Sequence, residues 1–279
     1  MTVTDTDTDT DTAAPASTAT LTRTAIVTGG AGGIGSAISR RLATAGYAVV
    51  VADADPEAAE LTAATLPGVD GAEHRGFAGD LTDSAVNRAL AEVAAAEAPI
   101  GVIVNAVGIS PKRDGRKISF FEMTDDEWNR VMAVNVSAPF FLIREAFRHM
   151  PTDGTASIVN LLSITAKLGA GGAPDAVFPP HLPSTVAYAA SKAALQNLTA
   201  SLSRELAGHR IRVNGVAPGF VQTPMMSSVP IDERLLGQVP MKRFAQPEEI
   251  ADAVAFLVSN RASYITGTSL DVNGGWVTC

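Results

Sequence analysis

The chain has 279 residues and a formal net charge of −8, and 46% of its residues are hydrophobic. A chain of this size buries roughly 75% of its unfolded surface, so its length allows one large α/β domain with a sizeable core. Lys and Arg residues are scattered through an acidic chain, which excludes the basic footprint of proteins that bind nucleic acid or anionic membranes. Neither nucleic acid nor a membrane is therefore an expected partner.

Residues 1–22 consist of Thr-Asp repeats followed by Ala, Pro, Ser and Thr, with almost no apolar side chain to bury. We expect a disordered tail there, and a single domain over residues 23–279. The only cysteine, Cys279, excludes an internal disulfide and fits a reducing compartment. No apolar run reaches the about 20 residues of a membrane-spanning helix, and the start lacks a signal-peptide pattern, so a cytoplasmic protein is expected.

The first apolar run, residues 25–27, leads into a glycine-rich turn, and Ile38 and Leu42 follow at helical spacing. A strand, a glycine turn and a helix in this order predict a dinucleotide site. Glycines let backbone N–H groups approach phosphates, and a helix N-terminus favours their negative charge. For the turn alone, a plain tight connection is the alternative. Two glycine patterns fit: Gly30-x-Gly32-x-x-Gly35 and Thr28-Gly29-x-x-x-Gly33-x-Gly35.

Asp53 ends the second apolar run, residues 48–52. An acid about 20 residues beyond the glycines is placed to bind the adenosine ribose, and its charge repels a 2′-phosphate. No Arg or Lys stands at Ala54, Asp55 or residues 30–32 to attract such a phosphate, so NAD is expected rather than NADP. A surface aspartate that opens a turn is the alternative, and it suits Asp55 better than Asp53.

Further apolar runs alternate with helical patterns along the chain. Strands are predicted at 74–78, 100–104, 156–161, 211–217 and 267–272, and helices at 56–66, 83–97, 124–150 and from 247 onward. This alternation predicts a Rossmann-like, doubly wound parallel sheet of about seven strands, with helices on both faces and a single domain. Ligands of such sheets bind at the carboxyl ends of the strands.

Several small or polar residues follow predicted strands. Asp80-Leu81 could frame an adenine, or Asp80 could simply be a turn residue before the next helix. The small residues of 105–108 suit a backbone that lies against a cofactor. Asn135 stands in an apolar helix, where an amide is costly unless it binds a backbone group or holds a water near the reaction centre. Ser163 follows the strand at 156–161.

Tyr188 and Lys192 are four residues apart in a segment with apolar residues at helical spacing, Leu195, Leu198 and Leu202. Their side chains should share one helix face, about one turn apart. An ammonium about 4 Å from a phenol brings a tyrosine pKa towards neutrality, which would make Tyr188 a general acid/base. For the pair alone, a half-buried aromatic beside a solvated lysine is the alternative.

Three segments are interpreted as loops near the strand ends. Residues 109–122, with four Lys or Arg residues, form a polar loop that is either solvated or in contact with a substrate. Residues 165–186, rich in Gly, Ala and Pro, are interpreted as an inserted active-site loop, with a surface excursion as the alternative. Residues 220–246 are interpreted as a substrate lid. The candidates to line a pocket are Phe178, His181 and Leu182.

Over residues 23–279 the chain resembles the short-chain dehydrogenase/reductase family. The motifs that carry the resemblance are Thr28-Gly29-x-x-x-Gly33-x-Gly35, Asp80-Leu81, Asn105-Ala-Val-Gly108, Asn135-Val136, Ser163, Tyr188-x-x-x-Lys192, Pro218-Gly219 and the ending from Gly267 to Gly275. Each motif is modest, but the set in this order is specific. Leu162 departs from the pattern, since many members have a serine there, so Ser163 is assigned by its place after Asn160, with Thr165 as a rival.

The resemblance implies a role for each motif residue. Tyr188 would be the acid/base, Lys192 would bind the nicotinamide ribose, Ser163 would bind the substrate oxygen, and Asn135 would hold a proton-relay water. The implied cofactor-binding residues are Gly29, Gly33, Ile34, Gly35, Asp53, Asp80, Leu81, Asn105, Ala106, Gly108, Tyr188, Lys192, Pro218, Gly219, Val221 and Thr223.

The implied function is NAD-dependent hydride transfer between a secondary alcohol and its ketone, both of them small molecules. The alternatives are an NADPH-dependent 3-oxoacyl reductase and an NAD-binding sensor or scaffold without catalysis. No metal site is expected. The resemblance also implies homotetramers or homodimers packed through the helices that hold Asn135 and Tyr188.

Overall fold

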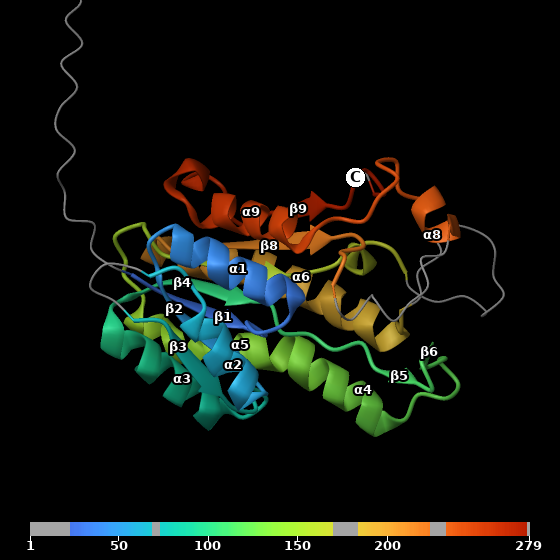
Figure 1. Cartoon of the computed structure of the whole chain (residues 1–279), viewed down its shortest axis with the longest axis horizontal. Helices are drawn as coiled ribbons and strands as arrows, with labels where there is room; N and C mark the ends of the chain where they lie inside the picture. Colours follow the sequence, from blue (N-terminus) through green and yellow to red (C-terminus); the bar gives the residue numbers. More distant parts are fainter. Residues whose placement is uncertain (1–22, 69–72, 170–183, 224–232, 278–279) are drawn as a thin grey trace, which may run out of the picture.

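The structure is a computed structural model, and it describes residues 23–68, 73–169, 184–223 and 233–277. Its centre is a seven-stranded, all-parallel sheet in the order β3-β2-β1-β4-β7-β8-β9 (Figure 1). The strands are β1 Thr24–Thr28, β2 Ala48–Asp53, β3 Arg75–Ala78, β4 Ile100–Asn105, β7 Ser157–Leu161, β8 Arg212–Pro218 and β9 Ser269–Val272. The predicted fold class is confirmed.

Helices cover both faces of this sheet (Figure 1). They are α1 Gly33–Thr44, α2 Pro56–Ala64, α3 Ser84–Glu97, α4 Asp125–Met132, α5 Ala138–Ala146, α6 Val186–Leu206, α8 Glu233–Gly237 and α9 Pro247–Val258. Alternate side chains of a strand enter opposite layers, so Ala25 and Val27 pack with α1, α2 and α9, whereas Ile26 packs with α3 and α5. Nearly continuous apolar strands such as β2 are the pattern of a sheet that is buried on both faces.

The order of the strands reverses between β1 and β4, because β2 and β3 lie on one side of β1, whereas β7, β8 and β9 lie beyond β4. Connections that leave β1 and β4 in opposite directions open a crevice at the carboxyl ends of the strands, where ligands of such sheets bind. The two connections touch there, since the Val107 N–H donates to the Thr28 hydroxyl at 3.3 Å. The residues predicted to bind cofactor after β1 and β4 therefore meet at this switch point.

Three features of the structure were not predicted. A two-stranded hairpin, β5 Lys112–Arg113 and β6 Arg116–Lys117, interrupts the polar loop 109–122. The helix predicted over 124–150 contains a π-helical segment, Ala133–Ser137, between α4 and α5. The short helix α8 lies within the segment interpreted as a lid. The tail 1–22 and the candidate pocket residues Phe178, His181 and Leu182 lie outside the described residues.

Candidate active site

The glycine turn between β1 and α1 is fixed by steric demands that only glycine meets. Gly29 has φ +62°, and a Cβ there would lie 3.0 Å from Val107 Cα. A Cβ on Gly30 would lie 2.7 Å from the Val27 carbonyl oxygen, and one on Gly35 would overlap the Gly29 carbonyl oxygen. The backbone of this turn therefore packs closely against the end of β1 and the loop after β4.

Gly32 differs from these glycines, because a Cβ on it would meet its nearest neighbour at an ordinary 3.5 Å. It is the N-cap residue of α1, and no side chain caps this helix end. Gly33, Ile34 and Gly35 form the first turn of α1. The first N–H groups of an α-helix have no acceptor within the helix, so this turn presents backbone donors.

Asp53 links β2 to the glycine turn. One of its carboxylate oxygens accepts a hydrogen bond from the Ala31 N–H at 3.2 Å, and the other accepts one from the Ala54 N–H at 2.8 Å. Asp55 instead caps α2 by accepting from the Glu57 and Ala58 N–H groups, so the alternative assignment as a turn aspartate suits Asp55. The carboxylate of Asp53 lies directly beside the turn that the sequence assigns to the cofactor phosphates.

The side chain of Asn105 turns into the sheet. Its amide donates to the Asn160 oxygen at 2.8 Å, and the Asn160 amide donates to the Thr199 hydroxyl at 2.9 Å. All three side chains are buried. This buried chain of amides ties the ends of β4 and β7 to α6, the helix that carries Tyr188 and Lys192.

Asn135 lies in the π-helical segment and is completely buried. Its amide oxygen accepts from the Ile109 N–H at 2.8 Å, and its amide nitrogen donates to the Ile109 carbonyl and the Ser191 hydroxyl, both at 3.0 Å. Of the two alternatives for this amide, binding to a backbone group is thus observed. A π-bulge commonly marks a functional site within a helix.

Gly108 brings the candidate catalytic residues together. A Cβ on Gly108 would lie 3.2 Å from the Lys192 ammonium and 3.6 Å from the Asn135 amide oxygen. Lys192 is buried, and its ammonium donates to the Leu161 carbonyl at 2.7 Å and lies 5.7 Å from the centre of the Tyr188 ring. The loop after β4, the π-helical segment and α6 therefore converge on one point.

Ser163 and Tyr188 complete this cluster, because the Ser163 side chain is near enough to the Tyr188 phenol to lower its pKa. Ser163 comes three residues after Asn160, just past the end of β7. Its hydroxyl accepts a hydrogen bond from the Thr165 N–H at 3.2 Å. Leu162 instead packs against Gly215 and joins an apolar cluster with Leu195. Ser163, rather than its rival Thr165, is thus the hydroxyl that reaches the tyrosine.

Burial dominates the titration of both α6 residues. It lowers the pKa of Lys192 to about 8. It raises the pKa of Tyr188, and the hydrogen bond with Ser163 only partly opposes this change. The direction for Tyr188 differs from the lowered pKa expected from the sequence, because desolvation of the tyrosine dominates, while the Lys192 ammonium donates its hydrogen bond to Leu161.

The remaining predicted cofactor residues have varied surroundings. Asp80 is exposed and accepts two hydrogen bonds from Thr82, which lower its pKa. Of its two alternatives, the turn residue is thus observed, and the contact with adenine stays a prediction. Leu81 is buried in the core below it. The N–H of Gly219, after Pro218, donates to the Val272 carbonyl at 3.0 Å, which holds the end of β8 against β9.

Val221 is buried and pairs with Ala245 in an isolated parallel bridge, while Thr223 is the last described residue of that segment. Two backbone hydrogen bonds reinforce the bridge, from the Gln222 N–H to the Ala245 carbonyl and from the Ala245 N–H to the Phe220 carbonyl, at 2.8 and 2.9 Å. The two ends of the segment interpreted as a lid are therefore fastened together.

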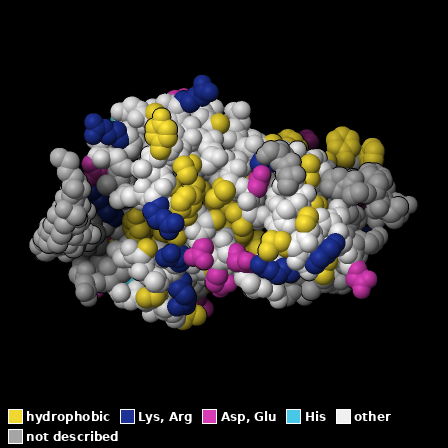
Figure 2. Space-filling model, turned by 90° about the horizontal axis from the view of Figure 1, so that it is seen from above, with side chains coloured by type: hydrophobic (Ala, Val, Ile, Leu, Met, Phe, Trp, Pro, Cys, Tyr) yellow, Lys and Arg dark blue, Asp and Glu magenta, His cyan; other side chains and the backbone are white. Residues whose placement is uncertain are grey.

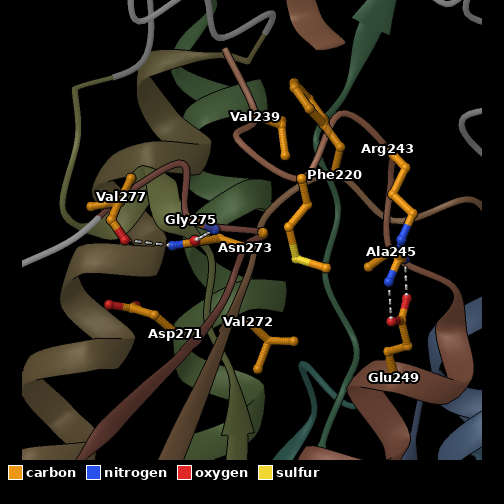
Figure 3. A pocket seen from close by; sticks show the side chains of 12 residues that line it. Phe220, Val239, Arg243, Ala245, Glu249, Asp271, Val272, Asn273, Gly275 and Val277 are labelled. Atoms are coloured by element: carbon orange, nitrogen blue, oxygen red, sulfur yellow. Dashed lines mark hydrogen bonds and ion pairs between the residues drawn. The ribbon is translucent and has the colours of Figure 1, made fainter. Parts of the chain in front are cut away.

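A separate cavity of about 360 Å³ lies beyond β9, outside this cluster (Figure 3). Phe220 and Val239 line one part of it, and the ion pair of Arg243 with Glu249 lies on another side. On the face shown in Figure 2, basic and acidic side chains are interspersed rather than gathered in one patch. Within the described residues, no helix is long and apolar enough to cross a membrane, and no group of three or more His, Cys, Asp or Glu side chains is placed to hold a metal.

The sheet, the glycine turn and the cluster around Tyr188 define a dinucleotide-linked oxidoreductase fold and site. The sequence profile of the family described as "Enoyl-(Acyl carrier protein) reductase" matches residues 29–277. The chain belongs to the short-chain dehydrogenase/reductase family.

Among its relatives, the (3R)-3-hydroxyacyl-CoA dehydrogenase of Canis lupus familiaris is 38% identical over 262 residues, covering 90% of this chain and 95% of the relative. The 3-oxoacyl-(acyl-carrier-protein) reductase FabG of Escherichia coli is 36% identical over 256 residues, covering 91% and 96%. A crystal structure of a 3-oxoacyl-(acyl-carrier-protein) reductase with bound NAD from Brucella melitensis superposes with a TM-score of 0.80 at 31% identity, covering 92% of each chain. The chain is thus an oxidoreductase that acts on hydroxyl or keto groups.

Proposed function

We propose that this protein transfers hydride reversibly between NAD(H) and a secondary alcohol/ketone pair. The observation that carries the proposal is the convergence of Ser163, Tyr188 and the buried ammonium of Lys192 on one point. A phenol beside a serine hydroxyl offers two polar groups to one substrate oxygen. The same cluster lies at the carboxyl edge of the sheet, where the glycine turn is built for close backbone approach.

The chain has suitable residues for a nicotinamide dinucleotide, whose nicotinamide ring supplies the hydride acceptor or donor. The glycine turn with Gly29, Gly35 and the first turn of α1 would bind the pyrophosphate, and Asp53 would bind the adenosine ribose. Lys192 would bind the nicotinamide ribose. The remaining residues assigned to the cofactor are Gly33, Ile34, Asp80, Leu81, Asn105, Ala106, Gly108, Tyr188, Pro218, Gly219, Val221 and Thr223. The fit rests on the turn, where any side chain larger than hydrogen at Gly29 or Gly35 would clash with neighbouring backbone and so distort the donors of the turn.

Tyr188 moves the proton in this mechanism. During ketone reduction its hydroxyl donates a proton to the substrate oxygen, and during alcohol oxidation its phenolate removes that proton. Ser163 donates a hydrogen bond that holds the same oxygen in place. Because burial raises the pKa of Tyr188, the phenol is the form present at neutral pH, which favours the role of acid in reduction.

Lys192 and Asn135 support the tyrosine. With a pKa of about 8, Lys192 is mostly charged at neutral pH, and its charge favours the phenolate that forms when Tyr188 gives up its proton. Asn135 fixes the Ile109 backbone and the Ser191 hydroxyl, and the Ser191 hydroxyl donates to the Tyr188 carbonyl at 2.7 Å. Asn135 therefore positions both the loop after β4 and the start of α6, and we propose that it also holds a proton-relay water.

A Tyr188→Phe variant tests this mechanism, because it keeps the ring and removes the only proton that the tyrosine can transfer. We expect at least a hundredfold loss of kcat, as is typical when a general acid/base is removed, with little change in NADH affinity. NADH fluorescence titration gives the affinity, and initial rates of nicotinamide oxidation or reduction give kcat. Full turnover by the Tyr188→Phe variant would refute the mechanism.

A second candidate function is an NADPH-dependent 3-oxoacyl reductase, and the names of the two relatives favour the acyl class of substrate. The charge of Asp53 beside the Ala31 N–H argues against a 2′-phosphate at this position. Initial rates with NAD and with NADP separate the two candidates. A preference for NADP would overturn the role given to Asp53. If the protein binds NADH tightly but turns over no alcohol or ketone, the sensor or scaffold interpretation is favoured instead.

We also propose a homotetramer or homodimer in the cytoplasm, built through the face of α5 and α6. A shallow cavity of about 190 Å³ on this face is lined by the apolar side chains of Phe140, Ile143, Phe147 and Leu202. Phe140 is 39% exposed and lies beside the other apolar side chains of this cavity, so together they form an apolar patch that a second copy could cover. Residues 165–186 are proposed as an active-site loop and residues 220–246 as a substrate lid. Light scattering of the purified protein measures the oligomeric state.

A further inference from the structure

The β5–β6 hairpin places four cations in two directly opposed pairs. Lys112 faces Lys117, and Arg113 faces Arg116, in an antiparallel register. The turn 114–115 has positive φ at both residues, +51° and +73°, which is the conformation of a tight two-residue hairpin turn and fixes this register. Like charges directly opposite each other repel. The hairpin is therefore more stable when an anion lies between its cations.

The chain itself neutralises only part of this charge. Arg113 donates to the Glu127 carboxylate at 2.6 Å, and Lys117 also has a partner within the chain. Glu122 binds the Ser119 side chain and backbone, at 2.5 and 3.2 Å.

Lys112 and Arg116 are both exposed, and neither forms a hydrogen bond or ion pair with any part of the chain that the structure describes. The hydrogen bonds from Ser119 are the main cause that lowers the pKa of Glu122, and the charge of Arg116 contributes least, without an ion pair between the two side chains. Because they belong to different opposed pairs, Lys112 and Arg116 project from opposite faces of the hairpin, so these two cations are available to separate phosphate groups of one ligand.

An aromatic pair lies directly beyond the hairpin. The exposed fractions of Phe120 and Phe121 are 71% and 92%, and their rings meet edge to face with centres 5.4 Å apart. Ile118, two residues earlier, is buried and anchors this end of the hairpin in the protein. Two neighbouring exposed aromatic side chains indicate a recognition surface, and aromatic faces stack readily on nucleotide bases.

This surface lies beside the candidate active site. Ile109, whose backbone binds Asn135, is three residues before Lys112, and three residues span at most about 11 Å. Figure 1 shows the hairpin at the end of the molecule where α6 begins, on the same side as α8. A ligand bound here is outside the reaction centre but within reach of it through a flexible arm.

We propose that Lys112, Arg116 and the pair Phe120–Phe121 bind the nucleotide of a coenzyme A thioester, so that the ketone substrate is a 3-oxoacyl-CoA. The proposal rests on the hydride transfer proposed above and names its substrate class. Coenzyme A matches the surface group by group. Its phosphates pair with the two available cations, its adenine stacks on the aromatic pair, and its pantetheine arm leads to the hydroxyl of Tyr188.

The test compares two substrates that share one reacting group. Acetoacetyl-CoA carries the nucleotide, and the acetoacetyl thioester of N-acetylcysteamine lacks it. For the Lys112→Ala/Arg116→Ala variant we expect KM for acetoacetyl-CoA to rise about tenfold and kcat to stay unchanged, with the short thioester unaffected. Added salt should raise KM for acetoacetyl-CoA in the wild type and have much less effect in the variant, because screening weakens exposed charge pairs.

Matched controls separate this contact from a general charge effect. The Arg40→Ala/Arg261→Ala variant loses the same two charges from exposed sites on and just after other helices, and it should leave both KM values unchanged. The Phe120→Ala/Phe121→Ala variant should raise KM for acetoacetyl-CoA only. Melting curves of all three variants should match the wild type, since none of these side chains is buried.

Each other outcome overturns the proposal in a recognisable way. Equal losses with both thioesters, or no difference between the hairpin variant and its control, would show that the hairpin does not read the nucleotide. Hairpin-dependent turnover of an acyl-carrier-protein thioester but not of acetoacetyl-CoA would assign the surface to an acidic carrier protein. Turnover of simple ketones without any thioester would refute the substrate class and leave the proposed hydride transfer intact, whereas no turnover of any ketone would refute both.

Discussion

Replacing Asn160 by alanine should destabilise the protein strongly, because Asn160 is the middle member of the buried chain from Asn105 to Thr199. The change removes two hydrogen bonds, at 2.8 and 2.9 Å, each with a net contribution of about 1 kcal/mol. The Asn105 oxygen already has no partner within the described residues, so its amide would then be buried with no hydrogen bond at all. An orphaned buried polar group costs about 1–3 kcal/mol more, so we expect a total loss of about 3–5 kcal/mol.

Urea unfolding of the Asn160→Ala variant, followed by circular dichroism, measures this loss. A double-mutant cycle with Asn105→Ala isolates the amide pair. We expect a coupling energy of about 2–4 kcal/mol, because the double variant loses the shared hydrogen bond only once and no longer contains the orphaned Asn105 amide. Thr199→Ala leaves the hydrogen bond from Asn105 to Asn160 in place, so neither amide loses all of its partners, and the variant should cost less than Asn160→Ala. A loss below about 0.5 kcal/mol for Asn160→Ala would refute the view that these amides fasten α6 to the sheet.

Three further predictions concern the cofactor turn, the tyrosine and one surface ion pair. Gly35→Ala should weaken NADH binding at least tenfold, because the added methyl overlaps the Gly29 carbonyl, whereas Gly32→Ala has ordinary contacts and should bind nearly as the wild type does in a fluorescence titration. Since burial raises the pKa of Tyr188, kcat/KM for alcohol oxidation should climb into the alkaline range as the phenolate forms, while that for ketone reduction should fall there; identical pH profiles in both directions would contradict the assigned role. The pKa of Glu249 is lowered to about 2 by Arg243, so its contribution to stability is present above the unfolded pKa and is lost as pH falls towards about 2. Because both side chains are substantially exposed, Glu249→Gln should cost less than about 1 kcal/mol at neutral pH and nothing in strong acid, as urea unfolding at the two pH values can measure.

Most of the fold could be predicted from the sequence, because parallel strands buried on both faces leave long apolar runs. Strand β2 was predicted at residues 48–52 and ends at Asp53, and the Tyr188 helix was predicted with both key side chains on it. The sequence predicts the residues after strand ends equally well, since their positions follow from topology alone.

What the sequence could not predict depends on contacts between distant segments. Asn105 was assigned to the cofactor by its place at a strand end, but its side chain direction depends on Asn160, which comes 55 residues later. The pKa of Tyr188 depends on its burial by the whole fold, and this burial cannot be inferred from the spacing between Tyr188 and Lys192. The β5–β6 hairpin is different, because Asp114-Gly115 is a strong local hairpin signal that the polar flanking residues obscured.

The bridge between Val221 and Ala245 has a consequence for how this enzyme can diversify. Backbone hydrogen bonds close the segment at its base, directly before α9. Lengthening a closed loop is cheap, since each doubling of its length costs only about 0.6 kcal/mol in closure entropy. For the substrate lid proposed above, changes in loop length between the two ends would therefore cost the fold little, while the residues proposed to hold Tyr188 stay the same.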